Sequence, residues 1–451
     1  MSIFGVYNVS QASTILYYGL HALQHRGQEG AGIVTVDETE HFARFRGMGL
    51  VSEVFNKQNL ATLCGRMGIG SVLYANKSKG GLNNVPPLFF HHHSGDFSIA
   101  SDGNLVNARQ IVDYLENKGG LFQTATDCEL IAHLIKKEGG EDRINNLKDA
   151  LNMMEGGFTF IIMTKNRLYA VRDKYGLKPL VIGSLGDGYV VASESCAFDL
   201  IGATLIRDVA PGEVICIDSK GLRSSRYSQF QRHKMCAMEY IYLARPDSDI
   251  DGCNVHAYRK ESGRRLFQEC PADADIVVGV PDSSLSAAIG YSEASGIPYE
   301  MGLLKNKYVG RTFIQPSQEM REKGVKMKLS AVRSIVRDKR IVLVDDSIVR
   351  GTTSLQIVRL LRDAGAKEVH VRIASPMMAH PCFYGVDTST EEELLCSKRT
   401  LDEACHYIGA DSLGYLSSPS TNKSCHAKAD LCQACFTGEY PTVLYDFETE
   451  E

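Results

Sequence analysis

The chain contains no long apolar run: none of its hydrophobic stretches approaches the roughly 20 consecutive residues that a membrane helix needs. Its first residues, MSIFGVYNVSQAS, hold neither a basic segment nor an extended apolar one, so they do not predict a secretory signal. An excess of positive charge is also missing, since the formal net charge is −5, which excludes a polycationic surface for nucleic acid. We therefore expect a cytoplasmic protein that binds neither membranes nor nucleic acid.

Internal repeats and low-complexity segments are absent as well, and 451 residues are enough for two or more domains. Up to about residue 230, short β-type runs alternate with turns. These runs are VSEVF, FSIASDGNL, FTFIIMT, RLYAVRD, YVVASES and EVICI, and the clearest helical patterns lie around 10–25, 104–117 and 127–138. Farther on, ADIVV, KRIVLV and KEVHVRI are separated by helical stretches, which predicts parallel βαβ units. The polar segment 220–235 is the expected domain boundary.

The most informative stretch is IVLVDDSIVRGTTS at residues 341–354. Its β-branched run ends in Asp345 and Asp346, a Ser/Thr/Gly-rich turn follows, and then a helical pattern begins. A strand, a turn and a helix start in this order offer backbone N–H groups and a helix N-terminus to an anion. The two carboxylates suit the vicinal hydroxyls of a sugar, either directly or through Mg²⁺. The stretch therefore predicts a site for a phosphorylated sugar.

Two further segments in this half could serve the same ligand. The turn GVPDSS at 279–284 links a strand to a helix, would hold pyrophosphate by its N–H groups, and offers Mg²⁺ an oxygen from Ser283, although many βα turns look alike. Segment 304–333 is rich in Lys and Arg and has little apolar periodicity. It is either a solvated loop or a cationic lid that closes over phosphates and excludes water.

Taken together, these segments resemble the glutamine phosphoribosyl-diphosphate (PRPP) amidotransferase family. In the second half the resemblance lies in EYIYLARPDS (239–248), the turn 279–284, LKNKYVGRTFIQPSQ (304–318) and VDDSIVRGTTS (344–354). In the first half LQHRGQEGAGI (23–33), DGNLVN (102–107) and RDKYGLKPL (172–180) are similar to the family's glutaminase domain. The resemblance implies an α+β, N-terminal nucleophile hydrolase-like αββα sandwich over 1–230. An α/β type I phosphoribosyltransferase domain with a parallel sheet and a C-terminal iron–sulfur segment would follow over 231–451.

The resemblance also implies an enzyme that binds Mg²⁺-PRPP and replaces its pyrophosphate by ammonia, giving 5-phosphoribosylamine in the first step of purine synthesis. Asp345 and Asp346, with Lys305 and Arg311, would be the catalytic residues, and Ser283 would share the Mg²⁺ with the two carboxylates. The other residues implied to bind PRPP are Asp282, Ser283, Ser284, Lys307, Arg333, Ser347, Ile348, Val349, Arg350, Gly351, Thr352 and Thr353. Such a substitution needs charge stabilisation and a dry site more than a general acid or base.

The glutaminase half departs from the family pattern at three places. The family's mature chain starts with a Cys-Gly nucleophile segment, whereas this chain has Met1 and Ser2 there, and a thioether cannot attack an amide. The arginine that would pair with the glutamine carboxylate is replaced by Leu73, within GSVLY at 70–74. The Asn-Gly of the oxyanion hole appears as Asp102-Gly103, which would set a negative charge where an oxyanion develops. Asp127, which would contact the glutamine α-amine, is retained, as are Arg26 and Gly27.

These departures leave three interpretations open. The protein would use free ammonia, or ammonia handed over by another protein, while its first domain is a remnant. Removal of Met1 could instead expose Ser2 as a nucleophile, one residue out of register. Alternatively, the chain is a non-catalytic relative that binds PRPP or purine nucleotides and regulates an active partner. The family further implies purine nucleotides as feedback inhibitors and a homotetramer or homodimer.

Thirteen cysteines in a chain without an export signal favour reduced thiols or a metal site over disulfides. Cys432 and Cys435 form a C-x-x-C pair, which alone is compatible with zinc, redox or cluster sites. One class of the family carries a [4Fe–4S] cluster on four cysteines whose positions match Cys236, Cys382, Cys432 and Cys435. Four thiolates suit zinc equally well on chemistry alone, so it is the resemblance that selects iron–sulfur.

Overall fold

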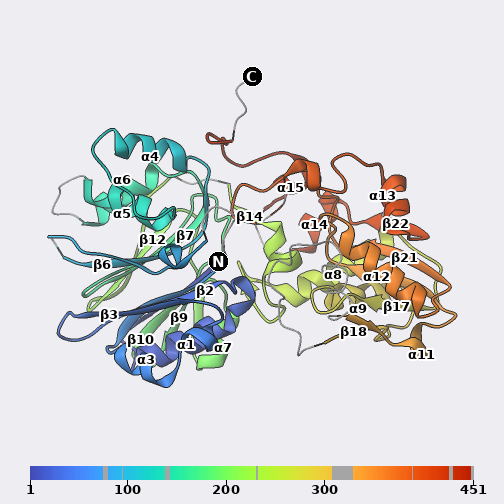
Figure 1. Ribbon diagram of the computed structural model, residues 1–451, viewed down its shortest axis with the longest axis horizontal. Helices are drawn as coiled ribbons and strands as arrows, with labels where there is room; N and C mark the ends of the chain where they lie inside the picture. Colours follow the sequence, from blue (N-terminus) through green and yellow to red (C-terminus); the bar gives the residue numbers. More distant parts are fainter. Residues whose placement is uncertain are drawn as a thin grey trace.

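The computed structural model describes residues 1–74, 80–93, 95–137, 143–229, 232–306, 329–386, 388, 390–425 and 430–447. These residues form two lobes that lie side by side, the first from the N-terminal half of the chain and the second from the C-terminal half (Figure 1). The predicted boundary falls on residues 230 and 231, which lie outside the described residues, so its position stays a prediction.

The first lobe is built on two antiparallel sheets. One has seven strands in the order β11-β9-β10-β1-β4-β2-β3, and the other has six in the order β13-β12-β8-β7-β6-β5. The first sheet comprises β1 (Ser2–Tyr7), β2 (Gly30–Val36), β3 (Phe42–Met48), β4 (Met67–Leu73), β9 (Val181–Leu185), β10 (Gly188–Ala192) and β11 (Thr204–Asp208). The second comprises β5 (Leu88–Phe90), β6 (Phe97–Leu105), β7 (Gly156–Thr164), β8 (Leu168–Arg172), β12 (Glu213–Asp218) and β13 (Gly221–Arg226).

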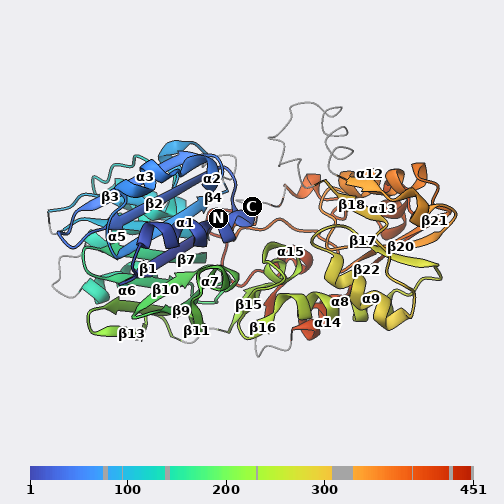
Figure 2. The same ribbon diagram turned by 90° about the horizontal axis from the view of Figure 1, so that it is seen from below.

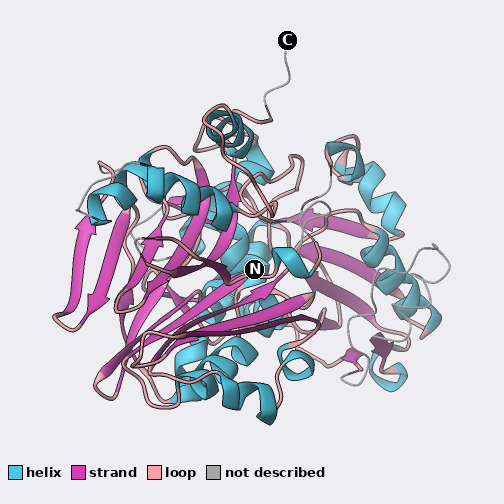
Figure 3. Cartoon of the chain, turned by 60° about the vertical axis from the view of Figure 1, so that its left-hand side comes forward, coloured by secondary structure: helices cyan, strands magenta, loops and turns pink. Residues whose placement is uncertain are grey.

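Helices cover both outer faces of the two stacked sheets, which confirms the predicted αββα sandwich (Figure 3). Strand β1 shows how the sequence builds these layers, because successive side chains of a strand point to opposite faces. Ile3 packs between the sheets with Ile69 and Ile161, whereas Phe4 packs outward against Leu16 of α1. The helices of this lobe are α1 (Ala12–Ala22), α2 (Val51–Val54), α3 (Lys57–Thr62), α4 (Ala108–Glu116), α5 (Asp127–Lys137), α6 (Arg143–Asn152) and α7 (Cys196–Ile201), with short 3-10 turns η1 (Gln24–Arg26) and η2 (Leu82–Asn84).

One strand prediction in this lobe is wrong. VSEVF was expected as a β-type run, yet Val51–Val54 form the helix α2. Val51 and Val54 are both buried, and residues three apart lie on one face of a helix but on opposite faces of a strand. The Glu53 carboxylate also accepts the Leu50 N–H at 2.8 Å, which caps the first turn. Burial of both valines on one side therefore overrides their β-propensity.

The second lobe contains a four-stranded parallel sheet in the order β17-β20-β21-β22. The alternating pattern predicts the first three of these strands but not β22. Helices α8 and α9 cover one face and α12 covers the other, so the sheet is buried on both sides (Figure 2). The strands are β17 (Ile276–Gly279), β20 (Arg340–Asp345), β21 (Glu368–Ile373) and β22 (Ser412–Tyr415). The helices are α8 (Val255–Glu269), α9 (Leu285–Ser295), α11 (Arg333–Val336), α12 (Thr352–Asp363), α13 (Leu401–Ile408), α14 (Ser418–Ser424) and the 3-10 turn η4 (Glu391–Glu393).

Short elements join the lobes and complete the second one. Strand β14 (Lys234–Cys236) pairs in parallel with β23 (Asp430–Cys432), which brings the start and the end of the C-terminal half together. The remaining elements are the π-helix η3 (Glu239–Leu243), β15 (Asp249–Ile250), β16 (Cys253–Asn254), β18 (Leu303–Lys305), β19 (Leu329–Ala331) and α15 (Ala434–Thr437). Among the residues that the structure describes, none of the helices combines the length and the apolar character needed to span a membrane.

Candidate active sites

The paired carboxylates predicted at the end of β20 lie beside the turn that follows β17. The two strands are parallel neighbours, with Gly279 opposite Val344, so their carboxyl ends meet at one edge of the sheet. The Ser284 hydroxyl donates to Asp345 Oδ1 at 2.9 Å, and the Asp346 N–H donates to the same oxygen at 2.9 Å. The Ser347 hydroxyl donates to Asp346 Oδ1 at 2.8 Å, and Ser283 lowers the pKa of the Asp346 carboxyl. The structure thus brings the predicted residues of both segments together.

The electrostatics of this pair favour a bound cation. Burial raises the pKa of Asp345 to about 8, and the neighbouring Asp346 carboxylate adds to the shift. Burial likewise raises the pKa of Asp346, opposed by the hydroxyls of Ser283 and Ser347 and by the charge of Arg259. Carboxylate and hydroxyl oxygens are ligands that Mg²⁺ prefers, and a divalent ion would relieve the repulsion between the two carboxylates.

The loop from Ser347 to Thr353 leads from β20 into α12. Ile348 is buried in the core of the lobe, and the Val349 carbonyl accepts the Leu395 N–H at 2.8 Å. These two contacts hold the loop against the rest of the lobe. Gly351 has φ +76°, in the left-handed region of the backbone, which favours glycine at this position. Thr352 and Thr353 are exposed at the N-terminus of α12, whose first turn holds no acidic residue. This arrangement suits a phosphate.

The predicted cationic residues are only partly placed. The Lys305 ammonium lies 2.7 Å from Asp282 Oδ2, and both side chains are exposed at the edge of the site. Arg350 pairs with Glu393 at 2.6 Å, and Arg333 is exposed at the start of α11. Lys307 and Arg311 lie outside the described residues, so the predicted lid stays a prediction.

The predicted remnant of a glutaminase pocket lies in the first lobe, around the start of β1. The Met1 ammonium is 3.6 Å from Asp102 Oδ1, which belongs to β6 of the other sheet. Leu73 is buried at the end of β4 and presents no charge. Gly103 has φ +115°, and a Cβ there would overlap the Gly157 carbonyl oxygen. Asp127 is buried at the start of α5.

Ser2 does not face this pocket. Ile3 packs between the two sheets, so the alternation of the strand turns the Ser2 side chain to the helix-covered face. The side chain is fully buried, and its hydroxyl makes no hydrogen bond within the described part of the chain. This placement counts against Ser2 as a replacement nucleophile.

A buried network of ion pairs fills the region between the pocket and the second lobe. The Arg26 guanidinium contacts both oxygens of Glu239 at 2.7 Å, Glu194 at 2.7 Å and Asp102 at 3.4 Å. The Lys178 ammonium is 3.4 Å from Glu239 Oε1. Burial alone would raise the pKa of Asp102, but the charges of Lys178, the Met1 ammonium and Arg26 lower it below its ordinary value. Asp102 is therefore a carboxylate held among cations.

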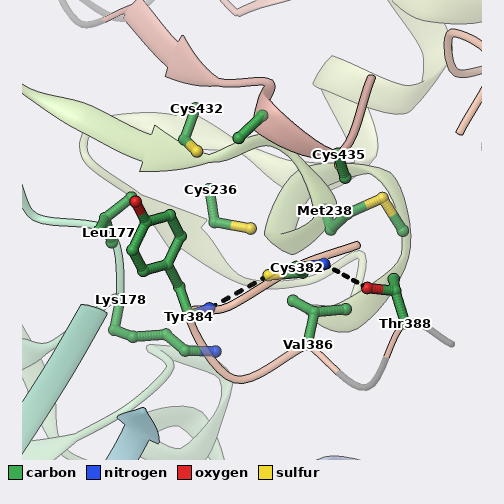
Figure 4. Close-up of a pocket in the computed structure, with 11 residues that line it drawn as sticks. Leu177, Lys178, Cys236, Met238, Cys382, Tyr384, Val386, Thr388, Cys432 and Cys435 are labelled. Atoms are coloured by element: carbon green, nitrogen blue, oxygen red, sulfur yellow. Dashed lines mark hydrogen bonds between the residues drawn. The ribbon is translucent and has the colours of Figure 1, made fainter. Parts of the chain in front are cut away.

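The four predicted cluster cysteines line one small cavity at the junction of the lobes (Figure 4). Cys236 on β14 and Cys432 on β23 are register partners, Cys435 lies in α15, and Cys382 comes from the loop after β21. Burial raises the pKa of all four thiols, that of Cys432 to about 12. Within the described residues, however, no three His, Cys, Asp or Glu side chains converge closely enough to hold a metal ion. The cysteines share a cavity without forming a coordination site.

Known proteins match this chain along its whole length. Residues 83–199 match the model of the glutamine amidotransferase domain, and residues 258–389 that of the phosphoribosyl transferase domain. The amidophosphoribosyltransferase of Bacillus subtilis is 54% identical over 98% of this chain and 94% of its own length. The Staphylococcus aureus amidophosphoribosyltransferase is 49% identical over 99% of this chain and 92% of its own length.

A solved structure agrees. The glutamine PRPP amidotransferase from B. subtilis, complexed with ADP and GMP, superposes with a TM-score of 0.94 at 53% identity, covering 100% of this chain and 99% of that one. The chain belongs to the amidophosphoribosyltransferase family. This confirms the family and the fold class predicted from the motifs, and it makes the protein an enzyme of the phosphoribosyltransferase class in purine synthesis.

For this chain, sequence reasoning finds the local motifs but misses Glu194 and Glu239. Both carboxylates are fully buried and bind Arg26, although they are 168 and 213 residues away from it in the chain. Glu239 opens the quoted segment EYIYLARPDS, which gave a signal that it matters but not what it contacts. For Glu194 the sequence offers no local signal of its role.

Proposed function

We propose that this amidophosphoribosyltransferase makes 5-phosphoribosylamine and pyrophosphate from PRPP with free ammonia, or with ammonia delivered by another protein, and does not split glutamine. The observation that carries the proposal is the state of the remnant pocket. The thioether of Met1 stands at the position of the family's nucleophile. The Asp102 carboxylate lies 3.6 Å from the N-terminal nitrogen of Met1. A negative charge there would oppose an oxyanion, and neutral Leu73 would leave the glutamine carboxylate without a partner.

In the transferase site, Asp345 and Asp346 would hold Mg²⁺ and the ribose hydroxyls of PRPP, with Ser283 as a further ligand. The N–H groups and hydroxyls from Ser347 to Thr353 would bind the 5′-phosphate at the start of α12. Pyrophosphate would lie by the turn 282–284, close to Lys305, which already contacts Asp282 at 2.7 Å. Closure of segment 304–333, with Lys307 and Arg311, would then exclude water while ammonia displaces pyrophosphate at C1.

Purine nucleotides are proposed as feedback inhibitors. A nucleoside monophosphate carries the same 5-phosphoribosyl group as PRPP, so the loop 347–353 would bind either one. The solved B. subtilis relative was complexed with ADP and GMP, which supports nucleotide binding in this chain as well. The expected homotetramer or homodimer stays a prediction.

A [4Fe–4S] cluster is the proposed cofactor of the four cysteines. The donor type fits: four thiols from three segments of the chain line one cavity, and each has a raised pKa that a bound metal would offset. Cys236, Cys382, Cys432 and Cys435 would hold the cluster, which would act as a cross-link between β14, β23 and the loop after β21. Zinc remains the alternative metal for such a ligand set.

The test is an assay of pyrophosphate and phosphoribosylamine formation from Mg²⁺-PRPP on anaerobically purified protein, with ammonium or glutamine supplied separately. We expect turnover with ammonium. With glutamine, the rate of product formation should not exceed the rate measured without any nitrogen source. Turnover with glutamine would contradict the proposal and point to an unrecognised nucleophile. Inactivity with both would also contradict it and leave the protein as a regulatory relative.

A further inference from the structure

Arg259 is a buried cation in the N-terminal half of α8. The residue is 4% exposed, and its guanidinium donates to the Tyr240 carbonyl at 2.7 Å and to the Ala244 carbonyl at 2.8 Å. Both acceptors are neutral, and within the part of the chain that the structure describes the guanidinium forms no ion pair. Burial of a charge is costly unless negative charge lies nearby or arrives with a ligand.

The N-terminus of α8 lies at the edge of the sheet that carries the carboxylate pair. Helix α9 begins directly after the turn 279–284, and His256 Nδ1 at the start of α8 is 2.9 Å from Ser286 Oγ at the start of α9. The two helices therefore start side by side (Figure 2). Arg259 follows His256 by about one helical turn. This places Arg259 near the carboxyl ends of β17 and β20, where the carboxylate pair stands.

Asp346 is the carboxylate whose charge acts most strongly on Arg259. Burial lowers the pKa of Arg259, and the charge of Asp346 opposes this shift more than the charge of Glu194 does. Glu194 is already bound by Arg26 and by His25, each at 2.7 Å. Asp346, by contrast, has no basic side chain in ion-pair contact among the residues that the structure describes. Arg259 and Asp346 thus interact as charges without touching.

The carbonyls that hold Arg259 belong to a segment that packs against the loop 347–353. Tyr240 lies within η3, and Ala244 is the residue that follows it. Val349 of the loop packs against the apolar cluster that contains both of these residues. The position of the guanidinium is therefore tied to the loop that is predicted to bind the 5′-phosphate.

We propose that Arg259 is a positioning residue of the transferase site, where it supplies a fixed positive charge near Asp346. PRPP is a polyanion whose ribose is expected to lie against the two carboxylates, so a cation held at this edge offsets the repulsion between the carboxylates and the substrate. Because two carbonyls already hold the guanidinium, this charge is in place before the substrate binds. The inference rests on the proposed PRPP site and is independent of the nitrogen source.

Variants at this position separate the charge from its contacts. Arg259→Gln removes the charge but keeps a donor for a carbonyl, whereas Arg259→Lys keeps the charge and gives up the two-pronged contact with the carbonyls. Arg264→Gln is the matched control, because Arg264 lies in the same helix, is partly exposed and pairs with Glu293 at 2.8 Å. Binding of Mg²⁺-PRPP to the full-length proteins is measured by calorimetry, without any nitrogen source.

We expect Arg259→Gln to bind Mg²⁺-PRPP about tenfold more weakly than the wild-type protein, the size of one charge interaction in a site partly shielded from water. Arg259→Lys should stay within about threefold of the wild-type affinity because the charge remains. Arg264→Gln should stay within about twofold because its ion pair is partly exposed. Unchanged affinity in Arg259→Gln overturns the proposal, and so does a loss in Arg259→Lys that equals the loss in Arg259→Gln.

Binding of Mg²⁺ alone distinguishes the charge from a purely structural role. A fixed cation near Asp346 repels a metal cation, so Arg259→Gln should bind Mg²⁺ about two- to threefold more tightly while it binds PRPP more weakly. The titration is made at about pH 9, where protons no longer compete for the carboxylates. Damage to the site would instead weaken the binding of both ligands in Arg259→Gln, and that result overturns the proposal.

The wild-type protein separates this inference from the proposed function. Wild-type protein that does not bind Mg²⁺-PRPP would overturn the PRPP site and the role of Arg259 together. Wild-type protein that binds Mg²⁺-PRPP but draws its nitrogen from glutamine would overturn only the proposal on ammonia, and the comparison of the variants would still decide on Arg259.

Discussion

At the scale of single residues, Asp102 is the side chain on which the proposal of a first lobe without glutaminase activity depends most. The carboxylate is 98% buried, a position that is costly for an isolated charge, yet Arg26, Lys178 and the Met1 ammonium surround it. These three positive groups compensate the buried Asp102 carboxylate, at a position where the resemblance implies an asparagine. In the proposed account, the same carboxylate would oppose a developing oxyanion.

The carboxylate pair is the residue-scale feature on which turnover should depend. Replacing Asp345 and Asp346 by Asn keeps their size but removes the charge that would hold Mg²⁺ and ribose. We expect kcat/KM for PRPP with ammonium to fall by about 100-fold or more, measured by pyrophosphate release. Asp363→Asn, at the exposed end of α12, is the matched control and should leave the rate unchanged. Equal activity in the double variant would refute the site assignment.

The raised pKa of Asp345 predicts how binding depends on pH. Burial and Asp346 raise it to about 8, so in the ligand-free protein a proton competes with Mg²⁺ for this carboxylate at neutral pH. Affinity for Mg²⁺-PRPP should therefore rise with pH up to about 8, by at most about tenfold per pH unit, and then level off. Calorimetric titrations between pH 6 and pH 9, at about one-unit steps, would measure this. A flat profile in the wild-type protein would contradict the assignment, and Asp345→Asn should flatten it.

At the scale of elements, the packing of α8 against α9 depends on two glycines, one on each helix, each of which lies against the backbone of the other helix. A Cβ at Gly290 would overlap the Lys260 carbonyl oxygen, and one at Gly263 would overlap the Ala287 carbonyl oxygen. Backbone atoms within a helix cannot move aside as a flexible side chain would. The two helices together cover one face of the parallel sheet, so their separation would disturb the strands that carry the transferase loops.

Gly290→Ala tests this contact because two effects oppose each other. Alanine is favoured over glycine in a helix by about 1 kcal/mol, whereas overpacking typically costs about 1–3 kcal/mol and here meets backbone. We expect a net loss of about 1–2 kcal/mol in the free energy of unfolding, measured by urea denaturation. A gain in stability would show that the helices are free to separate.

Much of the fold follows from patterns within single elements. Strand β20 and its loop were predicted because a buried β-branched run, two carboxylates and a glycine stand next to one another. The prediction of a strand at helix α2 is wrong because the run VSEVF is too short to distinguish the 3.6-residue period of a helix from the two-residue period of a strand. Strand β22 was not predicted because SLGY holds few β-forming residues. The network of Arg26, Glu194 and Glu239 could not be predicted, since one sequence does not show which distant charges meet.

At the scale of the whole molecule, two sets of buried ion pairs join the lobes. Arg26 of the first lobe binds Glu239 of the second, and Arg172 at the end of β8 binds Asp251 with both nitrogens at 2.8 Å. Burial would raise the pKa of Asp251, but Arg172 and His233 lower it well below its usual range. Stability from this pair is therefore present above the unfolded pKa of about 3.9 and is lost as the pH falls below it.

Arg172→Met should loosen the junction, because it leaves Asp251 buried with only His233 beside it. We expect a loss of about 3–5 kcal/mol in the free energy of unfolding, measured by urea denaturation at neutral pH. Arg207→Met is the control, since Arg207 pairs with Glu213 within the first lobe and is partly exposed, and it should cost at most about 1 kcal/mol. Equal losses in both variants would show that the junction has no special dependence on Arg172.

The central claim, a transferase that does not draw its nitrogen from glutamine, is tested most directly by isotope competition. The protein is given Mg²⁺-PRPP with ¹⁵N-labelled ammonium and unlabelled glutamine together, and the isotope in the trapped phosphoribosylamine is read by mass spectrometry. The geometry of Met1, Leu73 and Asp102 predicts product that carries ¹⁵N throughout, at a rate that glutamine does not change. Product containing the unlabelled amide nitrogen would contradict the account.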